Sequence, residues 1–177
     1  MQLTGQRTLP VDRGTAWAAL NDVDLLKSAI PGCETFEAVA PDTYNVGIHA
    51  AIGPVRTRFA GTLTLADAQA PESTTLRFDM KGGAAGFARG DAKVRLQALD
   101  AQRTEMQYVV DASIGGKLAQ VGSRLVDAAA ATMADRFLEA FVTELAARHP
   151  ASVIEIGQPP GRLAMLWRFL KRLFGAH

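Results

Sequence analysis

The feature that most constrains the fold is a stretch from Lys117 to Ala147, whose apolar residues recur every three or four positions. That spacing places them along one side of an α-helix, and charged residues occupy much of the remaining surface. At about 1.5 Å per residue the helix would be roughly 45 Å long, so it needs a broad apolar surface to lie against. The predicted apolar stripe consists of Leu118, Val121, Gly122, Leu125, Ala129, Met133, Phe137, Phe141 and Leu145.

The residues before this helix alternate between apolar and polar side chains, which is typical of antiparallel strands with one covered face. Alternation is clear over 44–50, 55–65, 76–81, 91–97 and 105–112, and a first strand is predicted over 2–9. Asp12 and Asn21 or Asp22 are suited to cap two short helices that follow this first strand. We therefore expect an α+β fold, in which a curved, seven-stranded antiparallel sheet wraps around the long C-terminal helix.

Several inward positions of this predicted sheet carry small residues. One helix often cannot fill so wide a sheet, and small side chains leave further space beneath it. The pattern favours an internal cavity, and a fully packed core is the alternative. The small inward residues are Ala50, Gly61, Ala88, Gly90, Ala92 and Ala112.

Composition favours one domain in a chain of 177 residues with a formal net charge of +1. A near-neutral body argues against a nucleic-acid-binding protein, and a single cysteine, Cys33, excludes an intrachain disulfide. The first ten residues do not resemble a signal peptide, and no stretch of about 20 apolar residues is present. We expect a cytoplasmic protein.

Candidate catalytic and metal-binding patterns are weak. The three histidines are scattered, so no metal site is predicted, and Cys33 lies beside a turn without a nearby histidine. The glycine-rich stretch 81–90 is followed by a strand rather than a helix, which favours a hairpin over a phosphate-binding loop. Its glycines Gly82, Gly83 and Gly86 are candidates for a lid at the cavity mouth. We predict that the protein is not an enzyme.

Basic residues gather on the polar face of three predicted strands, at positions 56, 58, 77, 81, 89, 93 and 95. A solvated surface is the simpler interpretation. The sharper hypothesis is a docking surface for an acidic partner, because clustered arginines favour oriented, charge-steered association. The candidate docking residues are Arg56, Arg58, Arg89 and Lys93.

The C-terminal segment has the pattern of a basic amphipathic helix. Residues 148–161 are predicted to be a linker, and residues 162–177 to be a membrane-anchor helix. A helix of about 20 Å is shorter than the roughly 30 Å hydrocarbon core, so it would lie in the interface. The alternative is that the segment folds back on its own domain. The predicted membrane-binding residues are Leu163, Leu166, Trp167, Arg168, Phe169, Leu170, Lys171, Arg172, Leu173 and Phe174.

Four segments resemble motifs of the CoxG family of carbon monoxide dehydrogenase accessory proteins: 30–34 (IPGCE), 53–61 (GPVRTRFAG), 85–90 (AGFARG) and 114–124 (IGGKLAQVGSR). The resemblance covers roughly residues 1–147 and implies the helix-grip fold of the START-like (SRPBCC) superfamily. It also implies a non-catalytic accessory protein that accompanies a molybdenum hydroxylase such as carbon monoxide dehydrogenase. Family members are linked to membrane attachment of that enzyme and are thought to hold a quinone-type lipid.

Together these observations predict a ligand-binding domain over residues 1–147, peripherally attached to the inner face of the cell membrane by its tail. No tightly bound cofactor is expected, apart from a quinone or another lipid in the cavity. A cyclase- or hydrolase-like enzyme and a pure membrane tether without a ligand are the alternatives. The predicted ligand-binding residues are Tyr44, Ile48, Phe59, Phe78, Met80, Tyr108, Leu125 and Met133.

Overall fold

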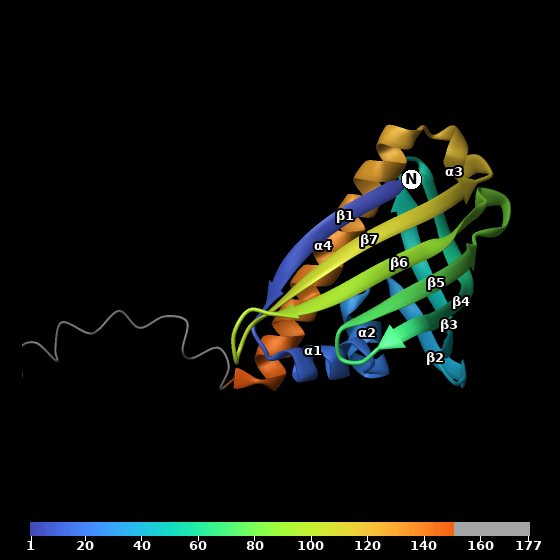
Figure 1. Cartoon of the computed structure of the whole chain (residues 1–177). Helices are drawn as coiled ribbons and strands as arrows, with labels where there is room; N and C mark the ends of the chain where they lie inside the picture. The colour runs from blue at the N-terminus through green and yellow to red at the C-terminus, as the bar shows by residue number, and fades with distance from the viewer. Residues whose placement is uncertain (151–177) are drawn as a thin grey trace, which may run out of the picture.

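The computed structural model describes residues 1–150, which contain four α-helices, one short 3-10 helix and seven strands (Figure 1). The predicted order is confirmed: one strand, two short helices, six strands and a long helix. The anchor helix and nearly all of the predicted linker lie outside the described residues. The elements are β1 (Gln2–Leu9), α1 (Arg13–Leu20), α2 (Val23–Ala29), β2 (Cys33–Ala40), β3 (Thr43–Ile52), β4 (Val55–Gln69), β5 (Ser73–Lys81), η1 (Gly83–Ala85), β6 (Phe87–Ala98), β7 (Thr104–Gly115), α3 (Lys117–Gln120) and α4 (Ser123–Arg148).

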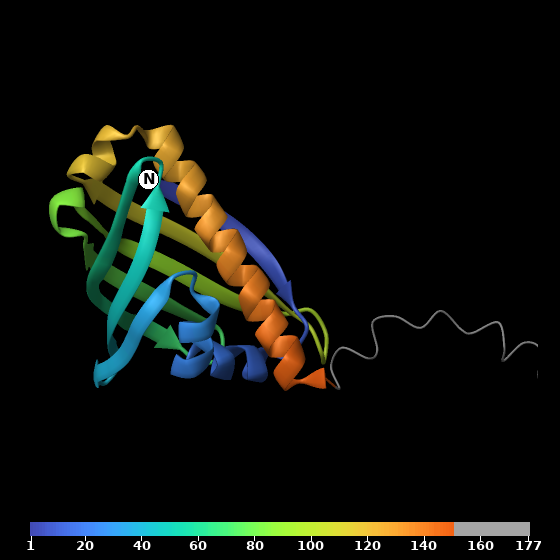
Figure 2. The same ribbon diagram turned by 180° about the vertical axis from the view of Figure 1, so that it is seen from behind.

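The seven strands form one antiparallel sheet in the order β1-β7-β6-β5-β4-β3-β2. Figure 2 shows α4 crossing the concave side of this sheet, with α1 and α2 covering its lower end. This arrangement confirms the helix-grip fold, because every strand turns its apolar face toward the helices.

Strong bending of the sheet depends on glycines at two points. A Cβ atom on Gly61 would contact the carbonyl oxygen of Asp79, and one on Gly90 would contact that of Asp111. At both positions only a residue without a side chain allows the neighbouring backbone to come so close. The small inward residues of the pattern therefore have a backbone role as well as leaving space.

The prediction of one continuous helix over 117–147 is wrong at its N-terminal end. Gly122 has a φ of +95°, a conformation that suits glycine, and it separates α3 from α4. The break changes the rotation of the following helix about its axis. Leu125, placed on the buried stripe by the spacing, is 49 % exposed, and Val126 is buried instead.

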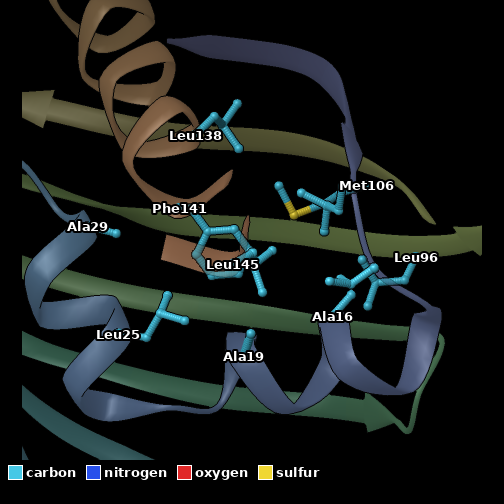
Figure 3. Packing of buried hydrophobic residues seen from close by; sticks show 11 residues of the cluster. Ala16, Ala19, Leu25, Ala29, Leu96, Met106, Leu138, Phe141 and Leu145 are labelled. Atoms are coloured by element: carbon cyan, nitrogen blue, oxygen red, sulfur yellow. The ribbon is translucent and has the colours of Figure 1, made fainter. Parts of the chain in front are cut away.

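The interior consists of two apolar clusters at different ends of the concave face. The first cluster joins α1 and α2 to the C-terminal half of α4 and to β6 and β7, around the fully buried Phe141 (Figure 3). The second cluster lies under β2 to β5 and includes Phe36, Phe59 and Met80, with Leu118 of α3 at its edge. The part of the concave face between them is only half-buried, and α4 passes over it.

The C-terminal end of α4 is tied to the N-terminus of α2 through Asp22. One carboxylate oxygen of Asp22 accepts a hydrogen bond from the backbone N–H of Leu25 at 2.9 Å. The other oxygen accepts one from the guanidinium of Arg148, also at 2.9 Å. The hydrogen bond from Leu25 and the nearby Arg148 charge both lower the pKa of Asp22 from its usual 3.8.

Replacing Asp22 with alanine should lower the free energy of unfolding by about 1 kcal/mol at pH 7, because the helix loses its N-cap. A depressed pKa in the folded state stabilises the fold above pH 3.8, and this contribution is lost as the pH falls through the folded-state value. The difference in unfolding free energy between wild type and Asp22→Ala should therefore shrink from pH 7 to pH 3 in denaturant titrations. Glu37→Ala, at an exposed position of β2, is the control and should change stability little.

Candidate ligand-binding cavity

A cavity of about 190 Å³ lies between the concave face of the sheet and the helices. Inward residues of β4 to β7 form its floor, and side chains of α1, α2 and α4 close it from the other side. The lining residues are Leu20, Leu26, Leu65, Thr74, Leu76, Ala92, Val94, Met106, Tyr108, Val110, Ala134, Phe137 and Leu138.

The wall of this cavity is apolar. Only two of its lining residues, Thr74 and Tyr108, carry a polar side-chain atom, and the Thr74 hydroxyl donates to the carbonyl oxygen of Ala66 at 3.4 Å. A water molecule needs two to four polar partners to be held in a buried site. The cavity therefore favours hydrocarbon over water.

Tyr108 lines the cavity with its ring, and its hydroxyl points toward the sheet edge. The phenol ring lies across Gly5 of β1, the residue paired with it, where a Cβ atom would contact the hydroxyl. Burial raises the pKa of Tyr108, the Asp135 carboxylate raises it further, and Arg7 opposes this shift. The hydroxyl thus stays protonated at neutral pH and remains a hydrogen-bond donor.

Of the eight predicted ligand-binding residues, the structure places only Tyr108 in the wall of this cavity. Leu125 lies against the β3–β4 turn, with its Cδ1 3.5 Å from a Cβ atom built on Gly53, and Met133 is half-buried outside the lining set. Tyr44, Ile48, Phe59, Phe78 and Met80 all belong to the second cluster.

The residues that sequence reasoning missed are mainly aliphatic side chains of β5, β6 and β7 and two helix positions, Ala134 and Leu138. A signal is present in the sequence, because Ala92 is one of the small inward residues of the pattern and does line the cavity. Alternation gives the face of each residue, but it does not locate the empty part of that face.

The sequence profile of the CoxG family, which is named after carbon monoxide dehydrogenase and its G-type accessory component, matches residues 5–146 of this chain. The chain belongs to the CoxG family. The expected relationship is confirmed, and CoxG proteins form a family of accessory subunits. A comparison with curated proteins gave no match.

Solved structures share the fold of this CoxG protein. A conserved protein from Geobacillus kaustophilus has a TM-score of 0.78 at 24 % identity, over 82 % of this chain and 95 % of that chain. A START superfamily protein from Mycobacterium smegmatis has a TM-score of 0.65 at 10 % identity, over 81 % and 96 %. The Zhui aromatase/cyclase from Streptomyces sp. R1128 has a TM-score of 0.63 at 15 % identity, over 84 % and 94 %.

The candidate lid glycines of this CoxG protein surround the 3-10 turn η1. The Phe59 ring lies across Gly82, and a Cβ atom on Gly86 would contact the backbone of Gly115. These close contacts join the turn to β4 and to the start of α3. None of the three glycines lines the cavity, so a lid role stays a prediction.

The basic residues lie on the convex face, as predicted, and acids interrupt them. Arg58 forms an ion pair with Glu34 at 3.0 Å, and Arg77 contacts both Asp67 and Asp91. Of the candidate docking residues, Arg89 stacks on the Phe87 ring at 5.0 Å. Arg56, Arg89 and Lys93 are exposed and have no ion-pair partner within residues 1–150.

The described residues contain no group of three or more histidine, cysteine or acidic side chains arranged to hold a metal ion. The Cys33 thiol is half-buried, and burial raises its pKa. In the same part of the chain, no helix has both the length and the apolar character needed to cross a membrane.

Proposed function

We propose that this CoxG-family protein holds a hydrophobic ligand, a quinone or another lipid, in the cavity beneath α4. The single observation that carries the proposal is the apolar, roughly 190 Å³ cavity within a START-like fold. With Thr74 engaged by the backbone and Tyr108 turned toward β1, the wall offers hydrocarbon contacts and no acid–base pair. We therefore propose a carrier rather than an enzyme.

The volume limits what the cavity encloses. An engineered apolar cavity of about 150 Å³ holds benzene, and drug-sized ligands need about 300 Å³ or more. A cavity of 190 Å³ would take one ring or a short piece of an isoprenoid chain. The rest of a long lipid would run along the half-buried concave face toward Ile48, Phe78 and Leu63 of the second cluster, which includes part of the predicted ligand set.

A titration of the full chain with a short-chain prenylated quinone tests this proposal. Calorimetry should show saturable binding with one ligand per chain and a negative heat-capacity change, because apolar surface is removed from water. A quinone without the prenyl chain should bind more weakly. Heats that do not saturate with either compound would contradict the proposal.

We further propose that the C-terminal segment binds the inner face of the cell membrane and brings a molybdenum hydroxylase, such as carbon monoxide dehydrogenase, to it. The support is the family relationship together with the amphipathic pattern of residues 162–177. Leu166→Asp/Leu170→Asp should reduce flotation with anionic vesicles, because two apolar contacts are replaced by charges. Equal flotation of this variant and the wild type would exclude the anchor.

The proposed docking surface for the hydroxylase is the convex face that carries Arg56, Arg58, Arg89 and Lys93. Its support is exposed positive charge, which steers association with an acidic surface. Arg56→Glu/Arg58→Glu should slow capture of the purified hydroxylase and reduce its dependence on salt. Unchanged capture would reject this surface.

A further inference from the structure

The two ends of the sheet differ sharply in charge. The turns β2–β3, β4–β5 and β6–β7 meet at one end, and each carries an acid: Asp42, Glu72 and Asp100 respectively. The opposite end, here called the loop end, consists of residues 50–56, 81–89 and 114–126. These three segments contain five cations and no aspartate or glutamate: Arg56, Lys81, Arg89, Lys117 and Arg124.

The three segments of the loop end form one surface. A Cβ atom on Gly53 would lie 3.5 Å from Leu125, which joins the β3–β4 turn to the start of α4. The backbone of Gly86 packs against Gly115 and Gly116, which joins η1 to α3. Figures 1 and 2 both show the β3–β4 turn, η1 and α3 together at the end remote from α1.

Exposed side chains on this surface are either cationic or apolar and small. All five cations are exposed, and so are Ala51, Pro54, Ala84 and Ala119. Leu125 is the largest apolar side chain in the group and is 49 % exposed. The acids that border the loop end along the chain are Asp79, Asp111 and Asp127.

We propose that the loop end is a second membrane-contacting surface, which binds anionic lipid head groups independently of the C-terminal segment. Cations near an anionic surface are each attracted to it, and apolar side chains among them enter the head-group region. Protein interfaces instead centre on tryptophan and tyrosine, and the loop end contains neither. The acidic turns at the other end of the sheet would orient the domain with the loop end toward the lipid.

The length of α4 does not prevent both contacts from being made at once. Its 26 residues span about 39 Å, and the C-terminal segment leaves from the far end. Residues 148–161 reach at most roughly 50 Å when extended. An anchored tail therefore leaves the loop end free to reach the same membrane.

A pair of fluorescent probes tests the orientation in the full-length protein. In a Cys33→Ser background, an environment-sensitive dye is attached at Ala84→Cys in η1 or at Ala101→Cys in the β6–β7 turn, both exposed alanines. With vesicles of equal parts phosphatidylglycerol and phosphatidylcholine, the dye at position 84 should brighten and shift to shorter wavelength, and the dye at 101 should not. A response at 101 alone, or at neither position on vesicle-bound protein, would overturn the proposal.

Charge removal provides the second test and leaves the proposed docking residues and the cavity unchanged. Lys117→Gln and Arg124→Gln should each weaken partition onto these vesicles by about five-fold. Lys27→Gln/Arg103→Gln, which removes two cations from the other end, should leave partition unchanged. If the Lys117/Arg124 double variant instead loses capture of the hydroxylase while vesicle partition is unaltered, the surface binds an acidic protein and the proposal is wrong. Quinone titration should be unaffected in all variants, so the fate of this proposal is separable from that of the cavity.

Discussion

Replacing Phe141 with alanine is expected to lower the free energy of unfolding by about 3 to 5 kcal/mol. Phe141 is fully buried where α4 meets α1, α2 and the sheet, and its ring lies 5.5 Å from that of Phe137. The substitution removes the side chain on which these elements converge (Figure 3) and leaves a cavity that surrounding helices cannot fill. The midpoint of thermal unfolding should fall by roughly 6 to 20 °C.

The matched control for this prediction is Leu99→Ala. Leu99 is 46 % exposed in the β6–β7 turn, so its truncation should change stability by less than about 0.5 kcal/mol. Denaturant titration of the three proteins, followed by circular dichroism, gives both values. A loss below about 1 kcal/mol for Phe141→Ala would show that α4 is not held to the sheet by this cluster.

Replacing Ala134 with leucine is expected to abolish most ligand binding while the fold is retained. Ala134 lies on α4 with its side chain at the cavity, so the added carbon atoms occupy space that the ligand would need. Quinone affinity should fall at least about ten-fold, which corresponds to about 1.4 kcal/mol. Filling a cavity often raises stability by about 0.5 to 2 kcal/mol, so the unfolding midpoint should not decrease.

Ala128→Leu is the control on the same helix, at an exposed position. It adds the same apolar group without entering the cavity, and its quinone affinity should equal that of the wild type. Equal affinities for both variants would place the ligand elsewhere. Reduced stability of Ala134→Leu would show that the cavity wall cannot accept the larger side chain, and Ala92→Val, a smaller addition on β6, would then replace it.

Strand positions could be predicted from the sequence because an antiparallel sheet with one covered face requires a period of two. The alternation of Tyr44, Val46 and Ile48 with polar residues reproduces the inward face of β3. The break before α4 could not be predicted in this way. Gly122 fits the helical spacing as a small residue, and only its positive φ separates the two helices.

A cavity could be predicted from the sequence, but most of its wall could not. Inward aromatic residues such as Phe59 and Phe78 are candidates because of their size, and they pack in the second cluster. The empty space lies instead beside Ala92, Val94 and Val110, where α4 bridges a strongly bent part of the sheet. Its position depends on sheet curvature and on the helix axis, and neither follows from the period of a sequence.

Native mass spectrometry of the gently extracted full-length protein tests the central claim most directly, namely that the cavity beneath α4 holds a hydrophobic ligand. We predict a lipid adduct of one molecule per chain, absent from Ala134→Leu and present in Ala128→Leu. Protein that carries no lipid in any preparation, or an adduct that persists unchanged in Ala134→Leu, would contradict the claim.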